Sequence, residues 1–260
     1  MSKKLIVGNW KMNPGTAKEA KALWQGLARL QPPKNTLCIA CPPTPYLALF
    51  SHSTISAKNL SRNLILGAQN LSFKEGTGAL TGEYSAEMLA SLGVRYAIIG
   101  HSERRAIGET DIMVATKIKN ALNARLAPII CVGEKIRDDS GAFWHEVRKQ
   151  MKDSLALVSK KYAQEIVLAY EPVWAIGSSA VREATPEECK EMMIFIRKVL
   201  TDLFGVKDAG KIPIIYGGSV NPKNASNFLS FGGADGLLVG RDSRDPKKMK
   251  VLLDSLKNTK

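Results

Sequence analysis

The sequence has no long apolar run. No stretch approaches the roughly 20 residues that cross a bilayer, and after Lys3 and Lys4 the apolar segment Leu5-Ile6-Val7 is too short for a signal sequence. These absences argue against a membrane span and a secretory leader. We therefore expect a cytoplasmic protein that does not contact membranes.

Cysteine is scarce as well. Four cysteines in 260 residues make no disulfide framework. Cys38 and Cys41 are spaced C-x-x-C, but the surrounding Thr-Leu-Cys-Ile-Ala-Cys is typical of a strand, in which positions three apart face opposite ways. We expect neither a redox nor a zinc role for this pair.

Motifs for metals and cofactors are also missing. There is no H-x-x-x-H, no dense carboxylate cluster, no G-x-G-x-x-G after the first apolar run and no G-x-S-x-G nucleophile elbow. The sequence predicts chemistry without a metal or a cofactor. A Schiff base at Lys11 stays open at this point.

Acidic residues are outnumbered, because 37 Lys and Arg against 24 Asp and Glu give a net charge of +13. Such a charge fits nucleic-acid binding, attraction of an anionic substrate, or a solvated surface. The lysines are spread along the chain with only short clusters such as Lys247-Lys248-Lys250, without the interleaved aromatic residues that bind single strands. We favour the solvated surface and expect no nucleic-acid partner.

Short apolar runs are what the sequence does contain. Eight occur, at residues 5–10, 36–41, 64–69, 95–99, 126–132, 166–170, 212–216 and 235–239. They are continuous rather than alternating, which is typical of strands covered on both faces, and no hairpin-length pair separates them. Helical stripes lie between them, one formed by Ala20, Leu23, Trp24, Leu27 and Leu30 and another by Phe143, Val147, Met151, Leu155 and Val158.

Three helix starts are marked by a capping residue followed by proline, in Thr185-Pro186-Glu187-Glu188, Asn221-Pro222 and Asp245-Pro246. Strands and helices alternate evenly over residues 1–260 without a linker. The pattern predicts an α/β fold, a single-domain (β/α)8 TIM barrel. A doubly wound open sheet is the alternative.

Reactive side chains stand where the expected strands end, which is where such barrels carry their chemistry. They are Asn9 and Lys11 after the first run, His101 and Glu103 after the fourth, Glu171 after the sixth, Gly217-Gly218-Ser219 after the seventh and Gly240 after the eighth. Glycine-rich turns after the last two strands are typical of a phosphate site built from backbone N–H groups, although a tight turn alone also needs glycine. A phosphorylated substrate is indicated.

Glu171 ends an apolar strand and precedes Pro172, so we expect it in a cleft. Burial is expected to raise its pKa and to make it the base for a carbon-bound proton, and a rim carboxylate paired with arginine is the alternative. His101 is expected at a helix N-terminus, whose dipole would keep the imidazole neutral. The Lys11 ammonium is expected to face an oxyanion or a phosphate.

Four segments together resemble the signatures of one family, and they follow its order. They are Gly8-Asn9-Trp10-Lys11-Met12-Asn13, Gly100-His101-Ser102-Glu103-Arg104-Arg105, Ala169-Tyr170-Glu171-Pro172-Val173-Trp174-Ala175-Ile176-Gly177 and Tyr216-Gly217-Gly218-Ser219-Val220. On these residues the chain resembles the triosephosphate isomerases along nearly its whole length.

The resemblance implies interconversion of dihydroxyacetone phosphate and glyceraldehyde 3-phosphate through a cis-enediol(ate), in glycolysis and gluconeogenesis. It implies that Glu171 shuttles the proton between carbons, that His101 moves protons between oxygens, that Asn9 with Lys11 stabilises the oxyanion, and that Glu103 is the acidic partner near the lysine. It also implies that Gly177, Ser219 and Gly240 hold the phosphate, together with Arg241, which stands where glycine is common in the family.

Two loops complete the resemblance. Residues 172–184 resemble the closing lid, but Ser178 to Ala184 make it about two residues longer than the family pattern. A four-carbon sugar phosphate therefore stays open as substrate, and a basic barrel that binds without catalysis is the alternative class. Residues 71–84, ending in Thr81-Gly82-Glu83, resemble the loop that reaches into a neighbouring subunit, which implies a homodimer; an ordinary surface loop is the alternative.

Overall fold

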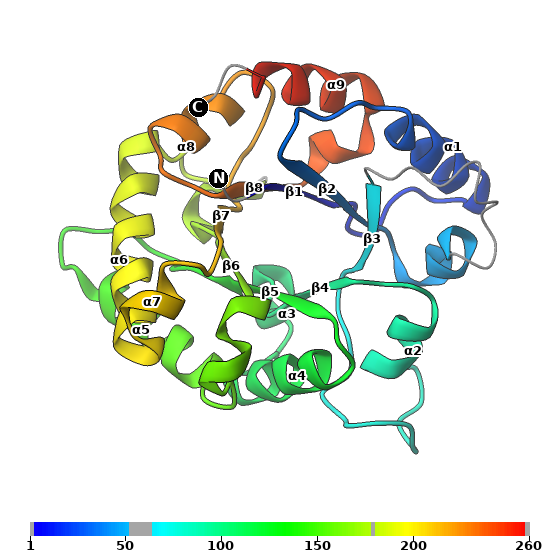
Figure 1. Cartoon of the computed structure of the whole chain (residues 1–260). Helices are drawn as coiled ribbons and strands as arrows, with labels where there is room; N and C mark the ends of the chain where they lie inside the picture. Colours follow the sequence, from blue (N-terminus) through cyan, green and yellow to red (C-terminus); the bar gives the residue numbers. More distant parts are fainter. Residues whose placement is uncertain (1–2, 52–63, 178–179, 258–260) are drawn as a thin grey trace.

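Eight parallel strands close into a barrel in the computed structural model, which describes residues 3–51, 64–177 and 180–257. The strands are β1 (Lys4–Asn9), β2 (Thr36–Cys41), β3 (Leu64–Ala68), β4 (Tyr96–Ile99), β5 (Ala127–Val132), β6 (Val167–Tyr170), β7 (Ile214–Tyr216) and β8 (Gly236–Val239). Each pairs with its neighbours in the chain, and β8 pairs with β1 (Figure 1). The predicted (β/α)8 barrel is confirmed.

Helices surround the ring of strands (Figure 1). The α-helices are α1 (Ala17–Ala28), α2 (Ala86–Ser91), α3 (Ser102–Ala106), α4 (Asp111–Asn123), α5 (Ala142–Ser154), α6 (Pro186–Phe204), α7 (Val206–Ala209), α8 (Ala225–Ser230) and α9 (Pro246–Ser255). Short 3-10 helices are η1 (Thr44–Phe50), η2 (Lys160–Glu165), η3 (Val173–Ala175) and η5 (Arg241–Arg244). Both predicted stripes begin on helices that cover the barrel, but they run past the helix ends, since Leu30 lies after α1 and Leu155 and Val158 lie after α5. Only Leu30 among their members is not buried.

Two apolar layers hold the barrel together, and strand alternation sorts residues between them. Cys38 packs in the outer layer, between strands and helices, whereas Cys41 packs in the inner layer that fills the barrel. Burial raises the pKa of both thiols, that of Cys38 to about 12. The predicted opposite orientation of the C-x-x-C pair is confirmed, and both cysteines are free thiols.

Two of the three predicted helix starts are confirmed. Thr185 and Glu188 form a capping box at α6, and the Asp245 side chain accepts the N–H groups of Lys247 and Lys248 at α9. The prediction at Asn221-Pro222 is wrong, because α8 begins only at Ala225. The Asn221 side chain caps a turn instead, accepting the N–H of Lys223 at 2.9 Å and of Asn224 at 3.2 Å.

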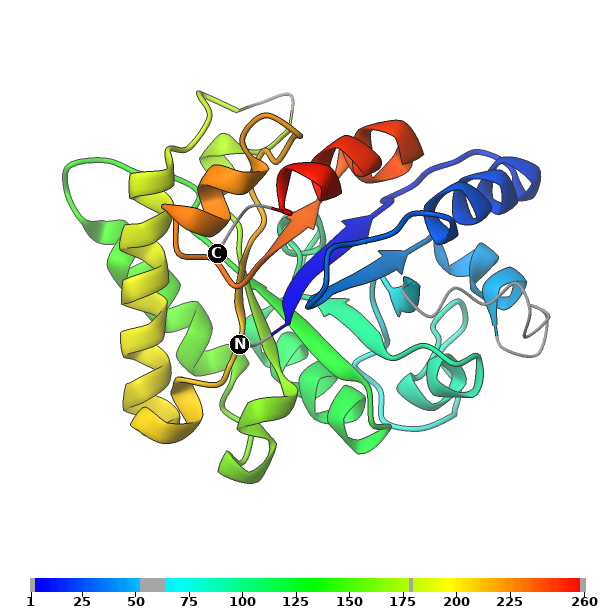
Figure 2. The same ribbon diagram turned by 45° about the horizontal axis from the view of Figure 1, so that its top comes forward.

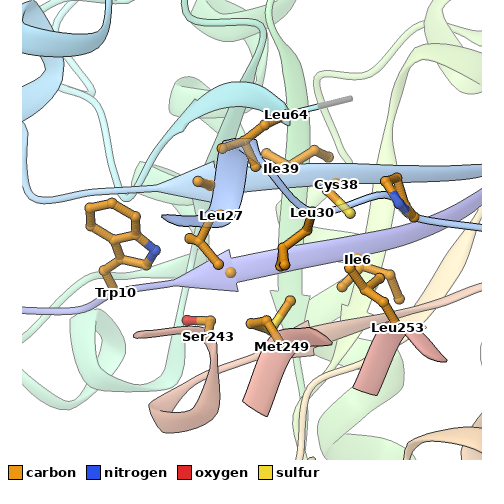
Figure 3. Close-up of a pocket in the computed structure, with 13 residues that line it drawn as sticks. Ile6, Trp10, Leu27, Leu30, Cys38, Ile39, Leu64, Ser243, Met249 and Leu253 are labelled. Carbon is orange, nitrogen blue, oxygen red and sulfur yellow. The ribbon is translucent and has the colours of Figure 1, made fainter. Parts of the chain in front are cut away.

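The outer layer contains a cavity of about 20 Å³ between β1, β2 and the helices α1 and α9. Figure 3 shows Leu27 and Leu30 from the α1 side and Met249 and Leu253 from α9 converging on it. Its lining is almost wholly apolar. None of the reactive residues of the strand ends lines it, so it belongs to the core and not to a functional site.

Candidate active site

The first group of site residues follows β1. Asn9 is buried, and its side-chain oxygen accepts the backbone N–H of Lys11 at 3.0 Å. Lys11 has φ of +52°, a left-handed conformation that is costly for a residue with a side chain. Gln69 holds that strained turn, since its amide donates to the carbonyls of Lys11 and Cys41, each at 2.8 Å. The Lys11 ammonium reaches Glu103 at 2.5 Å, so the predicted neighbours meet.

Glu171 directly follows β6 and is 2% exposed. Its Oε2 accepts the backbone N–H of Ser102 at 2.9 Å, and its Oε1 lies 3.0 Å from Nε2 of His101. Gly133 permits this packing, because a methyl carbon built there would lie 1.7 Å from the Glu171 carbonyl oxygen. Glu171 is thus buried and paired with His101, and the alternative of an arginine-paired rim carboxylate is not what the structure shows.

His101 is the N-cap of α3 and is also buried. Its Nδ1 accepts the backbone N–H of Glu103 at 3.2 Å. A proton on Nδ1 would point at that N–H, so the hydrogen bonds assign the ring proton to Nε2, which donates to Glu171. The helix terminus thus selects a neutral tautomer through one N–H group, and α3, with five residues, adds only a short dipole.

The expected rise in the pKa of Glu171 is wrong for the free site. Burial raises this pKa, but His101, the Ser102 N–H and the Lys11 charge lower it more, and the net pKa lies below the usual value. The same contacts act on His101, where burial lowers the pKa, and Glu171 and Glu103 together raise it above the usual value. The expectation that the helix terminus disfavours the charged imidazole is therefore wrong for the free site, because the two carboxylates outweigh burial and the short dipole. Specific donors likewise outweigh desolvation at the Glu171 carboxylate.

The glycine turns lie beside these side chains. A methyl carbon on Gly217 would lie 3.1 Å from Cγ of Glu171, and one on Gly240 would lie 3.9 Å from Cε of Lys11. The Ser219 hydroxyl donates to the Ala175 carbonyl at 2.7 Å, which joins the β7 turn to the segment that follows β6. Arg241 is exposed and begins η5 directly after Gly240.

The segment between β6 and α6 stands over this end of the barrel (Figure 2). Gly177 lies on it with φ of +76°, which favours glycine. Ser178 and Ser179, part of the predicted lid insertion, lie outside the described residues.

The predicted dimer loop is apart from these side chains. Residues 71–84 extend from the barrel between β3 and α2 (Figure 1), and Thr81 is exposed. Phe73 and Leu80 on this loop are 41% and 38% exposed, and Met12, next to Lys11, is 93% exposed.

Sequence reasoning missed Gly133, Gln69 and Glu134. Glu134 is fully buried, and its Oε1 accepts the Tyr170 hydroxyl at 2.8 Å and the Trp174 indole N–H at 2.7 Å. Burial raises the pKa of Glu134 despite these donors. Their position in the chain could have indicated Gly133 and Glu134, because both directly follow β5 in the same way that Glu171 directly follows β6.

The closed barrel and the polar side chains at its strand ends define an α/β-barrel enzyme of general acid/base type. Within the described ranges, no group of three or more His, Cys, Asp and Glu could hold a metal ion. The family model for triosephosphate isomerase matches residues 4–256. The chain belongs to the triosephosphate isomerase family, whose reaction is the isomerisation of a triose phosphate.

Curated relatives agree with the family match. The chain is 42% identical to the triosephosphate isomerase of Thermus thermophilus, over 97% of this chain and 98% of that protein. It is 40% identical to that of Flavobacterium johnsoniae, covering 92% and 94%, and 41% identical to that of Carboxydothermus hydrogenoformans, covering 92% and 93%.

Proposed function

We propose that this chain interconverts dihydroxyacetone phosphate and D-glyceraldehyde 3-phosphate, with Glu171 as the base. One observation carries the assignment of roles: a buried carboxylate, an imidazole N–H and an ammonium stand at the ends of three strands, with Glu171 3.0 Å from His101 and the Lys11 charge lowering the pKa of Glu171. Proton transfer next to a carbonyl needs a base, a hydrogen-bond donor at the oxygen, and a positive charge for the enediolate.

The proton moves in balanced steps. Glu171 removes a proton from C1 of dihydroxyacetone phosphate, which leaves an enediolate and a protonated carboxyl group. The Nε2–H of His101 polarises the carbonyl oxygen and moves a proton between O1 and O2. Glu171 then returns its proton to C2, which gives the aldehyde and regenerates the base.

The charge that develops on oxygen needs a cation nearby. Lys11 supplies it, and Asn9 fixes the turn that carries Lys11 through the 3.0 Å hydrogen bond to its N–H. Glu103 holds the ammonium in the free site at 2.5 Å. Because the side chain of Glu103 is 58% exposed, the ammonium can leave it for a substrate oxygen at low cost.

We assign the substrate phosphate to backbone N–H groups of Gly177, Ser219, Gly240 and Arg241. Ser219 and Gly240 follow β7 and β8, and a methyl carbon built on Gly240 would lie 3.9 Å from Cε of Lys11, which supports their place in the same site. Turns after the seventh and eighth strands are the usual phosphate site of such barrels. The exposed Arg241 side chain adds positive charge directly after Gly240.

We further propose one domain over residues 1–260, a homodimer, and a cytoplasmic place in glycolysis and gluconeogenesis. The exposed apolar side chains of Met12, Phe73 and Leu80 support a subunit interface at the 71–84 loop. Four buried free thiols fit a reducing compartment. Within the part of the chain that is described, no helix is long and apolar enough to cross a membrane.

A coupled assay with glyceraldehyde 3-phosphate tests the proposal. We expect turnover, with kcat/KM at least tenfold higher for three-carbon than for four-carbon sugar phosphates. A preference for the larger substrate would overturn the substrate assignment. Absent turnover together with steeply salt-dependent DNA binding would instead favour a binding protein. Sedimentation as a monomer at micromolar concentration would contradict the dimer.

A further inference from the structure

Gln150 is a residue of α5 that binds the backbone of Gly133, just after β5. Its Nε2 donates to the Gly133 carbonyl and its Oε1 accepts the Gly133 N–H, each at 3.0 Å. A primary amide carries an acceptor and a donor side by side, so it can pair with both backbone groups of one residue. The buried side chains of Val147 and Met151 hold this part of α5 on the barrel. Gln150 therefore ties Gly133 to a fixed helix.

The neighbouring strand β4 ends before it reaches Gly133. Its last residue, Ile99, pairs with Ile130, and the chain then turns into α3. Gly133 is buried, and buried backbone N–H and C=O groups need hydrogen-bond partners. The Gln150 amide supplies both partners where the strand no longer can.

The backbone of Glu171 rests directly on this stretch. A methyl carbon built on Gly133 would lie 1.7 Å from the Glu171 carbonyl oxygen. On either side of Gly133, the Glu171 N–H donates to the Val132 carbonyl at 2.8 Å, and the Val173 N–H donates to the Glu134 carbonyl at 3.0 Å. The position of Gly133 therefore sets the position from which the Glu171 side chain extends.

Close packing alone does not fix this contact. A cavity of about 290 Å³ opens beside it, and Ser102, Gly133, Gln150 and Glu171 are among its lining residues. A void lacks the dense contacts that hold groups in place in a packed core. Hydrogen bonds must therefore hold Gly133 on this side.

We propose that Gln150 is a positioning residue for the base, because its amide fixes Gly133 and Gly133 fixes the backbone from which Glu171 reaches His101 and the substrate carbon. A misplacement of about 1 Å far from the chemistry can cost roughly 100-fold in rate. Gln150 can thus affect turnover without touching a reacting group. The inference rests on the proposed role of Glu171 as the base.

Gln150→Met tests the proposal, since it keeps the length of the side chain and removes both hydrogen bonds. We expect kcat to fall roughly 10- to 100-fold. KM and the dissociation constant of inorganic phosphate should change less than about twofold, because Gln150 acts at β5 and not at the glycine turns after β7 and β8. The variant should fold, because water in the cavity can bind the freed groups of Gly133.

A second readout needs no turnover. Glu171 raises the pKa of His101, so a displaced carboxylate should give a lower His101 pKa in Gln150→Met, measured by nuclear magnetic resonance titration. A merely structural role of Gln150 would leave that pKa in place. Failure of the unmodified chain to turn over would refute the proposed function, whereas the His101 titration still decides whether Gln150 positions Glu171.

Gln150→Asn is the conservative variant, because it keeps the amide on a side chain one methylene shorter. Its kcat and its His101 pKa should lie between those of Gln150→Met and the unmodified chain. If Gln150→Met does not fold, the same two readouts in Gln150→Asn decide, and unmodified values there would overturn the proposal.

Gln164→Met is the matched control. The Gln164 amide donates to Asp208 at 2.9 Å, and Gln164 precedes β6, at the strand end opposite to Glu171. This variant should keep the kcat and the His101 pKa of the unmodified chain. The same kcat and the same His101 pKa in Gln150→Met and Gln164→Met would overturn the proposal.

Discussion

Replacing Glu171 with glutamine tests the proposed base while leaving the side-chain shape intact. In the unmodified protein each carboxylate oxygen of Glu171 faces a donor, the Ser102 N–H at 2.9 Å and the His101 Nε2–H at 3.0 Å. In the variant the glutamine side chain keeps one acceptor oxygen, and its NH2 group faces the other donor, with which it cannot form a hydrogen bond. The variant therefore loses the negative charge and one buried hydrogen bond.

The two losses have different sizes. A buried donor left without an acceptor costs about 1–3 kcal/mol, which is less than the roughly 5–15 kcal/mol that holds a domain folded. The Glu171→Gln variant should fold and keep its oligomeric state. Loss of the acid/base group should lower kcat by at least ~10³, or about 4 kcal/mol in the barrier.

The coupled assay and a thermal unfolding scan measure these two effects separately. A third readout follows from the charge: Glu171 raises the pKa of His101, so nuclear magnetic resonance titration should give a lower His101 pKa in the Glu171→Gln variant. A folded variant with a near-normal kcat would refute the role of Glu171. An unchanged His101 pKa would refute the coupling of the two side chains.

Three further predictions concern charge and burial. Lys11→Met should lower kcat/KM at least ~10²-fold with little change in thermal stability, since its ion pair is partly exposed; an unaltered rate would contradict the oxyanion role. The pKa of Glu171 is lowered on folding, so the stability advantage of the unmodified chain over Glu171→Gln should be present above about pH 4.5 and be lost progressively as the pH falls from there through the lowered pKa of the folded state; unfolding scans from pH 3 to 7 that show an advantage growing with acid would disprove this. Glu134→Leu should destabilise the fold by about 2–4 kcal/mol, because the Tyr170 and Trp174 donors lose their acceptor, whereas Glu134→Gln should cost about 1 kcal/mol or less; equal melting temperatures for the two variants would count against the hydrogen-bond explanation.

The barrel was predictable because its strands are buried on both faces. A strand covered by helices outside and side chains inside reads as one apolar run, and all eight runs match observed strands within two residues at each end. Helix starts were less reliable. Asp245-Pro246 and Asn221-Pro222 carry the same local signal, but the chain after Asn221 turns once more before α8 begins. Which of the two starts a helix depends on packing that the local sequence does not encode.

The site was predictable in its members but not in its contacts. Parallel strands bring their carboxyl ends to one face, so Lys11, His101 and Glu171 were expected to meet there. Their hydrogen bonds depend on backbone groups that carry no side-chain signature, such as the N–H of Ser102 and that of Glu103. The pKa of Glu171 was mispredicted for this reason, since burial is visible in an apolar run and a backbone donor is not.

The free site holds its base with the same groups that the reaction uses. The Nε2–H that the substrate carbonyl needs is occupied by Glu171, and the Lys11 ammonium is occupied by Glu103. Substrate must exchange both contacts, so part of its binding free energy is spent on rearranging the site. The phosphate group, which does not react, can supply that energy through Gly177, Ser219, Gly240 and Arg241. A substrate without phosphate should therefore lose kcat as well as affinity, because the groups that perform the proton transfer would stay paired with each other.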